Sequence, residues 1–378
     1  MTEDNDEIDT FDDDDIYSDT WYKTMDILNK KAKEKKIPIS VSCELTPLCN
    51  LKCKMCYIRL DKKEMDDIGK LLNADDWIKL LKEMQEVGVF ALLMTGGEPT
   101  LHPGFVQIYS EAAKLGFIIE LYTNAVMLSG EVFSVLKQYP PKVITVTVYG
   151  ASEEIYEKIC GNREAFGMTL KNIRILKESL TNTKINFRTT LVKDNIHEIN
   201  DIKKIAENMK LPFAYSYGKI KPVRGAVRPE ISSCRISLCE IVQMKKDSLK
   251  DIKNIKLREK EAKSVAHTEK IINGYNCEIN ETVKNEPLRC EAAELSCAVT
   301  WDGKMLPCLL FSNPYFRPLE IGFKKAWDEI REMEKTITLP KRCSVCKNRP
   351  YCGSCPAYAQ AESGTYLDGE PYDCFFNK

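Results

Sequence analysis

The feature that most constrains the fold is a repeated alternation between short apolar, β-branched runs and longer helix-like segments. Six such runs are each followed by a helical pattern: Pro38 to Ser42, Val89 to Thr95, Ile118 to Asn124, Val143 to Val148, Ile185 to Val192 and Phe213 to Tyr217. Strand-then-helix units favour parallel strands joined by right-handed helical crossovers. We therefore predict an α/β protein with a partial (β/α)6 TIM-like barrel over about residues 37–220.

One helical segment carries its boundaries in its own sequence. Asn73 is a suitable N-cap, Asp75 and Asp76 follow in the first turn, and Gly88 is suited to end the helix. The apolar residues between these limits recur at helical spacing: Trp77, Leu80, Leu81, Met84 and Val87. We predict an amphipathic helix between Asn73 and Gly88.

The composition limits the class of protein. The 378 residues carry 55 Lys and Arg against 56 Asp and Glu, a formal charge of −1, which argues against a dedicated nucleic-acid binder. No run approaches the roughly 18 to 20 apolar residues that span a bilayer, and the first residues, MTEDNDEID, do not resemble a secretory signal. We expect a cytoplasmic protein with no nucleic-acid or membrane partner, in which thiols stay reduced.

Cysteine is the most informative residue type, with 16 Cys against only 3 His. Cys49, Cys53 and Cys56 follow the first predicted strand in CxxxCxxC spacing, and chemistry in a (β/α) barrel lies at the carboxyl ends of strands. Three thiolates on one loop can hold three irons of a [4Fe–4S] cube and leave the fourth iron open. The alternative is zinc, which requires four ligands; Cys43 would have to reach back from the strand.

The second motif, TGGEP at residues 95–99, lies at the end of the second predicted strand. Gly96 and Gly97 allow a close backbone approach to a ligand, and Pro99 stiffens the exit. Glu98 supplies a carboxylate with which an ammonium group can pair. This motif alone is typical of an ordinary turn, but after CxxxCxxC it indicates a cofactor site.

With these two motifs, residues 37–220 resemble the radical S-adenosylmethionine (SAM) superfamily. The resemblance implies that Cys49, Cys53 and Cys56 hold a [4Fe–4S] cluster, whose open iron is chelated by the amino and carboxylate groups of SAM. Gly96, Gly97 and Glu98 would line the methionine amino group. It further implies reductive cleavage of SAM to a 5′-deoxyadenosyl radical, with an external electron donor such as flavodoxin or ferredoxin.

The same resemblance suggests further contacts with SAM. Thr147 matches the position of a ribose-contacting hydroxyl, with an ordinary strand residue as the alternative. Met55 stands where an aromatic residue usually packs on adenine. For the SAM carboxylate, Arg163 and Arg188 are the candidates, since Cys160 stands near the usual arginine position.

The C-terminal part contains eight further cysteines at short spacings: Cys290, Cys297, Cys308, Cys343, Cys346, Cys352, Cys355 and Cys374. Residues 285–378 resemble the SPASM extension of radical SAM enzymes, which carries two auxiliary [4Fe–4S] clusters. The resemblance assigns Cys290, Cys297, Cys308 and Cys355 to the first cluster, and Cys343, Cys346, Cys352 and Cys374 to the second. Because Cys352 and Cys355 are closer together than usual, this partition is open to change, and a zinc ribbon is the alternative.

The chain thus divides into four predicted parts. Residues 1–19 form a disordered acidic tail, 20–228 the radical SAM core, 229–284 a helical linker and 285–378 the auxiliary-cluster domain. The core is expected to begin with a short helix over 20–36.

The resemblance to SPASM enzymes implies a peptide or protein substrate. Leu309 stands where sulfatase maturases carry a basic Asp, so we favour oxidative crosslinking of a ribosomally made peptide over sulfatase maturation. Leader recognition would then come from the barrel, the second domain or a separate protein. The alternatives are oxidation or decarboxylation of a haem-type precursor, with a zinc-dependent interaction module as the non-enzymatic hypothesis. Five basic residues could meet the carboxylates of such a precursor: Lys219, Lys221, Arg224, Arg228 and Arg235.

Overall fold

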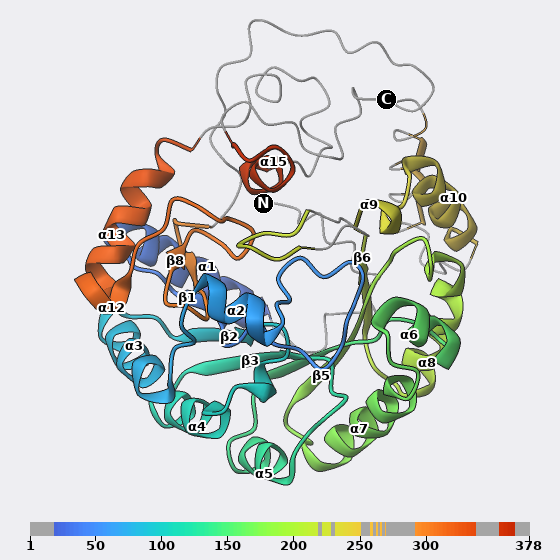
Figure 1. The fold of residues 1–378 in the computed structure, drawn as a ribbon, viewed down its shortest axis with the longest axis horizontal. Helices are drawn as coiled ribbons and strands as arrows, with labels where there is room; N and C mark the ends of the chain where they lie inside the picture. Colours follow the sequence, from blue (N-terminus) through green and yellow to red (C-terminus); the bar gives the residue numbers. More distant parts are fainter. Residues whose placement is uncertain are drawn as a thin grey trace, which may run out of the picture.

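The computed structural model describes residues 19–217, 221–227, 231–250, 292–337 and 355–366, with single short stretches between 258 and 269. Its centre is one sheet in the order β6-β5-β4-β3-β2-β1-β7-β8 (Figure 1). The strands are β1 Ser40–Glu44, β2 Ala91–Thr95, β3 Ile118–Thr123, β4 Val143–Thr147, β5 Lys184–Thr190, β6 Phe213–Ser216, β7 Ser296–Val299 and β8 Met305–Leu306. Strands β1 to β6 are parallel to their neighbours, and the sheet stays open.

Helices follow the strands and form an outer ring around the sheet (Figure 1). They are α1 Asp19–Lys35, α2 Lys62–Ile68, α3 Ala74–Val87, α4 Phe105–Lys114, α5 Gly130–Gln138, α6 Glu153–Cys160, α7 Ala165–Ser179, α8 Ile199–Asn208, α9 Ile231–Cys234, α10 Leu238–Ser248, α12 Pro318–Ile321, α13 Phe323–Glu334 and α15 Pro356–Ser363. All six predicted strands and the predicted N-terminal helix are therefore confirmed. Each described helix is too short or too polar to cross a bilayer.

The predicted capped helix is confirmed as α3. Asn73 forms a capping box with Asp76, and Gly88 ends the helix with φ 109°, a conformation that favours glycine. Trp77 and three further apolar residues of its predicted face are fully buried, namely Leu80, Leu81 and Met84. The spacing of apolar residues thus determined which face of this helix packs on the sheet.

The two faces of the sheet differ in polarity because side chains alternate along a strand. Leu121, Val146 and Phe187 are fully buried in the main core, where helices cover the sheet. At the alternate positions, Thr145 of β4 donates a hydrogen bond to Glu120 of β3 (3.2 Å). The inner face of the partial barrel is therefore polar.

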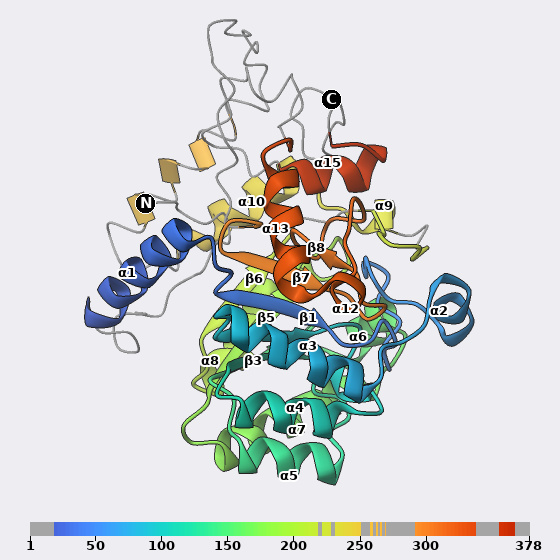
Figure 2. The same ribbon diagram turned by 90° about the vertical axis from the view of Figure 1, so that its left-hand side faces the viewer.

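The C-terminal part contributes to the same sheet. β7 runs parallel to β1, with Val41 opposite Cys297, and β8 is antiparallel to β7. In the helical ring, α13 packs against α3, and its buried Trp327 donates a hydrogen bond to the carbonyl of Lys36 (2.8 Å). Figure 2 shows β7 beside β1, whereas α1 and α2 project on opposite sides. The linear order of the chain gave no indication of this joint sheet.

His102 makes stability depend on pH. Its Nδ1 accepts a hydrogen bond from the Gly104 amide (2.9 Å), so Nε2 carries the proton and donates to the Leu72 carbonyl (2.9 Å). Burial lowers the pKa of His102 below its unfolded value, so the unfolded chain binds the extra proton first. We expect the free energy of unfolding to fall as the pH drops below about 6.5. His102→Gln should flatten this dependence in denaturant titrations at pH 7.5 and 5.5; an unchanged slope would contradict the assignment.

Candidate active site

The predicted cysteines lie on a loop between β1 and α2, called here the cysteine loop (residues 45–61), which packs against the turn after β2. The Gly97 amide donates to the Thr46 carbonyl (2.7 Å), and the Glu98 amide donates to the Leu48 carbonyl (2.9 Å). A Cβ on Gly96 would lie 2.4 Å from the Thr46 carbonyl oxygen, and Gly96 has φ 149°. The two glycines therefore admit the backbone of the cysteine loop itself.

A methyl group at Gly97 should disturb this contact. Its Cβ would lie 2.5 Å from the Leu48 carbonyl oxygen, so the cysteine loop must move before Gly97→Ala can fold. We expect a loss of stability of about 1–3 kcal/mol and lower iron incorporation at the cysteine loop. Denaturant titration and iron analysis measure the two effects, with Gly167→Ala, where a Cβ meets nothing within 4 Å, as the control. Equal iron incorporation in both variants would contradict this expectation.

Cys49, Cys53 and Cys56 are brought together by the cysteine loop. Cys53 is buried, and Cys49 and Cys56 are half-buried. Burial raises the pKa of Cys49, and the neighbouring Cys53, Glu98 and Cys56 raise it further. Three thiols this close to one another can ionise together only if positive charge is supplied, as irons supply it.

The donor set fits an iron–sulfur cube better than a single metal ion. Among the described residues, no three His, Cys, Asp or Glu side chains are arranged to hold one ion. In a cube each thiolate binds a different iron, so the sulfurs need not converge on one point. Cys43, the alternative fourth ligand, is buried in β1, and burial raises its thiol pKa to about 12. Beside Cys49, the side-chain nitrogen of Asn50 is buried without a hydrogen-bond partner among the described residues.

Glu98 is fully buried and is held by a dense set of donors. Its Oε1 accepts from the Thr123 hydroxyl (2.9 Å) and from the hydroxyl and amide of Thr100 (2.7 and 3.3 Å). Its Oε2 accepts from the Asn124 amide (2.8 Å). Burial raises the pKa of Glu98, and these hydrogen bonds lower it. The carboxylate is thereby oriented in a fixed position close to Cys49.

Asn124 connects Glu98 to the cysteine loop, and the sequence had not singled it out. Its side-chain nitrogen donates to Asn50 Oδ1 (2.8 Å) and to Cys49 Sγ (3.6 Å). The available signal was a polar pair, Thr123 and Asn124, at the carboxyl end of an apolar strand.

Tyr149 and Cys160 complete the surroundings of Cys53. Tyr149, just after β4, and Cys160, at the end of α6, both hydrogen-bond the Cys53 sulfur. The Cys160 contact and burial raise the pKa of Cys53, whereas the Tyr149 hydrogen bond lowers it. The Cys160 carbonyl also accepts from the Lys52 amide (2.9 Å), so the end of α6 fixes the cysteine loop.

The predicted SAM contacts occupy different places. Thr147 ends β4 and lies opposite Arg188 of β5, and both are half-buried at the carboxyl end of the sheet. Arg163 instead forms an exposed ion pair with Glu153 (3.0 Å). Met55 is buried in the main core. Of the two arginine candidates, Arg188 lies beside a predicted site residue on the sheet, whereas Arg163 is engaged at the surface.

The auxiliary cysteines are only partly within the described residues. Cys297 is buried in β7 near Cys43. Cys308 and Cys355 are half-buried and pack together around a small core that contains Phe311. The remaining predicted ligands lie outside the described residues: Cys290, Cys343, Cys346, Cys352 and Cys374. So does the predicted acidic tail up to residue 18.

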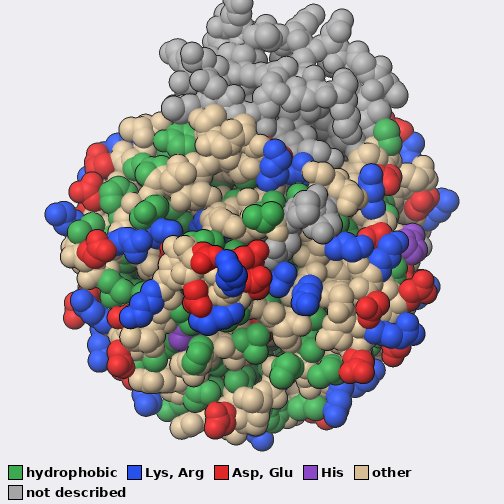
Figure 3. Space-filling model, viewed as in Figure 1, with side chains coloured by type: hydrophobic (Ala, Val, Ile, Leu, Met, Phe, Trp, Pro, Cys, Tyr) green, Lys and Arg blue, Asp and Glu red, His purple; other side chains and the backbone are tan. Residues whose placement is uncertain are grey.

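A charged helix, α2, follows the cysteine loop. Figure 3 shows side chains of both signs gathered over α2. Lys62 pairs with Asp66 and Lys63 with Asp67, both at 2.8 Å. Exposed pairs of this kind contribute about 0.5 kcal/mol or less each, so they favour solubility more than stability.

Comparisons with known proteins agree with this geometry. Residues 43–206 match the model of the radical SAM superfamily. The AdoMet-dependent heme synthase of Methanosarcina barkeri is 25% identical, covering 89% of this chain and 96% of that protein. The PqqA peptide cyclase of Bradyrhizobium diazoefficiens is 27% identical, but the alignment covers only 52% of each protein.

A solved structure shares the fold along nearly the whole chain. Streptococcus suis SuiB, bound to its precursor peptide SuiA, has a TM-score of 0.63 at 16% identity, covering 99% of this chain and 83% of SuiB. Members of the matched family use SAM and a [4Fe–4S] cluster, which the arrangement of the cysteine loop and Glu98 fits. Residues 43–206 of this chain are therefore a radical SAM domain, and the chain is a radical SAM enzyme.

Proposed function

We propose that this enzyme oxidatively modifies a peptide or protein substrate, by crosslink formation in a ribosomally made peptide. The observation that carries the radical chemistry is the placement of Cys49, Cys53 and Cys56 on one loop beside the buried carboxylate of Glu98. The similarity to a peptide cyclase, and to the fold of a protein bound to its precursor peptide, supports the substrate class.

Each residue of the site would have a separate role in binding the cluster or SAM. Cys49, Cys53 and Cys56 would hold the cluster, and Glu98 with Gly96 and Gly97 would receive the amino group of SAM. Thr147 would contact the ribose, Met55 the adenine and Arg188 the carboxylate. When bound, the cluster would supply the electron that breaks the sulfonium S–C5′ bond, giving methionine and a 5′-deoxyadenosyl radical. The buried surroundings of Cys53 would keep water from the radical.

The C-terminal cysteines would complete the oxidation. We propose one auxiliary [4Fe–4S] cluster on Cys290, Cys297, Cys308 and Cys355, and a second on Cys343, Cys346, Cys352 and Cys374. After one hydrogen atom has gone to the 5′-deoxyadenosyl radical, the substrate radical would form the new bond to a second side chain of the peptide. That side chain would lose a proton to a base, and the remaining electron would pass to an auxiliary cluster. A flavodoxin or ferredoxin would reduce the cluster of the cysteine loop. A separate protein would present a leader peptide.

Oxidation of a haem-type precursor is the second candidate, favoured by the nearly full-length similarity to a heme synthase. Three of the five basic residues expected to meet its carboxylates have other partners, whereas Lys219 and Arg228 lie outside the described residues. Arg235 pairs with Glu362, Arg224 pairs with Glu44, and Lys221 donates to the Glu362 carbonyl (2.8 Å). Side chains engaged in this way are poorly placed to receive a tetrapyrrole carboxylate, which weighs toward the peptide substrate.

Co-expression with candidate peptides tests the proposal. Mass spectrometry should detect a peptide that has lost two hydrogens with the native enzyme and remains unmodified with Cys53→Ala. Iron analysis of the anaerobically purified protein should give about 12 Fe per chain if all three clusters assemble. Turnover of a porphyrin precursor without any peptide product would favour the second candidate, and zinc without acid-labile sulfide would favour the non-enzymatic hypothesis.

A further inference from the structure

A short segment contacts both the cysteine loop and the C-terminal region. Residues 221–227, called here the strap, lie between β6 and α9. The Val223 amide donates to the carbonyl of Tyr57 (2.9 Å), directly after Cys56. The Lys221 amide donates to Glu362 of α15 (3.0 Å). The strap therefore contacts both the cysteine loop and the C-terminal region that supplies Cys355.

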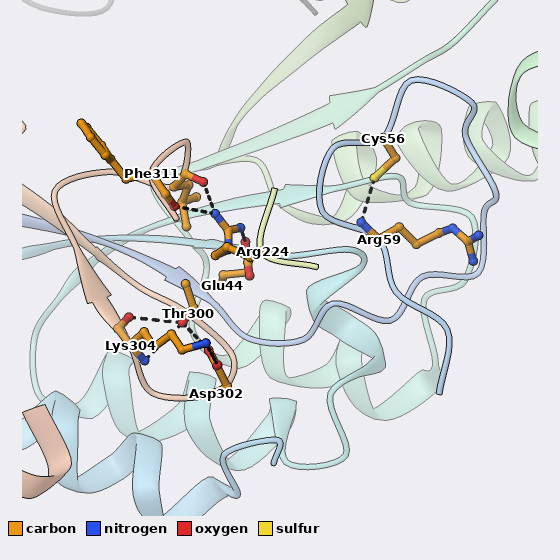
Figure 4. Close-up of polar contacts among 9 residues, drawn as sticks. Glu44, Cys56, Arg59, Arg224, Thr300, Asp302, Lys304 and Phe311 are labelled. Carbon is orange, nitrogen blue, oxygen red and sulfur yellow. Dashed lines mark hydrogen bonds and ion pairs between the residues drawn. The ribbon is translucent and has the colours of Figure 1, made fainter. Parts of the chain in front are cut away.

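Arg224 is the central residue of the strap (Figure 4). Its guanidinium donates to Glu44 Oε2 at the end of β1 (2.5 Å), to the Leu309 carbonyl, and to the Phe311 carbonyl (3.3 Å). The Arg224 side chain is 6% exposed and that of Glu44 is fully buried. Leu309 directly follows Cys308, so this one side chain ties the end of β1 to the loop of a predicted auxiliary-cluster ligand.

The Arg224–Glu44 ion pair lies close to Tyr57, which follows Cys56 of the cysteine loop and is also near Cys308. Burial is the largest cause of the raised pKa of Tyr57. The charges of Arg224 and Glu44 and the thiols of Cys56 and Cys308 also act on the Tyr57 hydroxyl. Leu310 and Val223 pack in the same small core as Tyr57 and Cys56.

Stability alone explains this arrangement poorly. Arg224 has φ 53°, a left-handed conformation that costs an L-residue about 1–2 kcal/mol. Arg224 Nε and Glu44 Oε1 are buried without hydrogen-bond partners among the described residues. Buried ion pairs with unsatisfied atoms seldom exceed well-packed apolar residues in stability. The nearby Asp302, which raises the pKa of Glu44 while Arg224 lowers it, is itself paired with Lys304 (2.6 Å).

We propose that Arg224 and Glu44 position the Cys308 loop and set the reduction potential of the auxiliary cluster bound there. This inference rests on the proposed auxiliary cluster. A guanidinium near the cluster favours its reduced, more negative state, and Glu44 moderates that effect. The auxiliary cluster at Cys308 would accept the electron from the substrate radical, and Arg224 would fix both the position and the reduction potential of that cluster.

Spectroelectrochemistry with EPR detection tests the inference. The parent is the full chain with Cys49, Cys53 and Cys56 replaced by alanine, so that only auxiliary signals remain. Arg224→Gln should make the midpoint potential of one signal more negative, and Glu44→Gln should make it less negative. We expect each to change the equilibrium constant for one-electron reduction on the order of tenfold, or about 59 mV. Arg224→Lys should shift the potential less than Arg224→Gln does.

Lys158→Gln is the control, because it also removes one positive charge from an ion pair, that with Asp194 (2.8 Å), but lies on α6. It should leave the potential unchanged. Opposite shifts at Arg224 and Glu44 support the inference, since general loosening of the fold gives no such sign reversal. Unshifted potentials, or shifts of one sign in all variants including the control, overturn it. If Arg224→Gln does not fold, the nearly isosteric Glu44→Gln decides by the sign of its shift alone. A parent without any auxiliary signal overturns the auxiliary-cluster proposal and this inference together.

Discussion

Replacing Cys53 by alanine should abolish the formation of 5′-deoxyadenosine, a loss of at least about 100-fold, because one iron of the cube loses its thiolate. Cys53 is buried and lies among Cys160, Tyr149 and the other two loop cysteines, so no water-exposed side chain can replace it. The auxiliary cysteines are untouched, and about 8 Fe per chain should remain. Chromatography of the products after chemical reduction with SAM measures the first effect, and iron analysis measures the second.

Cys160→Ala is the control for this experiment. The Cys160 thiol contacts Cys53 and is also buried, so the substitution removes a neighbouring sulfur without removing an assigned ligand. Iron content and cleavage of SAM should persist in this variant. If Cys53→Ala still yields 5′-deoxyadenosine, or if Cys160→Ala loses the cluster instead, the assignment of the three ligands is wrong.

Glu98→Gln should weaken the binding of SAM to the reconstituted protein by about tenfold to hundredfold. A charge-assisted hydrogen bond contributes about 1.5–3 kcal/mol, and the substitution removes the negative charge that would meet the amino group of SAM. The new amide nitrogen cannot accept a hydrogen bond, so it must face a donor from Thr100, Thr123 or Asn124. The protein should therefore also lose about 1–3 kcal/mol of stability.

Equilibrium dialysis with labelled SAM, together with denaturant titration of the same preparation, separates the two effects. Glu334→Gln is the control, since burial also raises the pKa of Glu334, which lies at the end of α13 in the helical ring. It should retain the affinity for SAM. Loss of stability without loss of affinity in Glu98→Gln would give Glu98 a purely structural role.

Much of the fold could be predicted because its signals are local. Six strands and α3 follow from apolar periodicity and from capping residues a few positions apart, which act through neighbouring backbone groups. The spacing of Cys49, Cys53 and Cys56 fixes three thiols on one loop, whatever surrounds them. Gly96 and Gly97 were predicted to allow a close backbone approach to a ligand, and in the structure the backbone of the cysteine loop approaches them.

The sequence by itself therefore determined the parallel α/β core and the set of thiols, because both depend on short-range patterns. Only the tertiary structure decided which distant side chains meet those thiols. Asn124, Tyr149 and Cys160 reach the cysteine loop from three different elements. Arg224 meets Glu44 across 180 positions and Leu309 across 85. Contacts this far apart arise when the barrel brings the carboxyl ends of its strands together, and no local pattern records them.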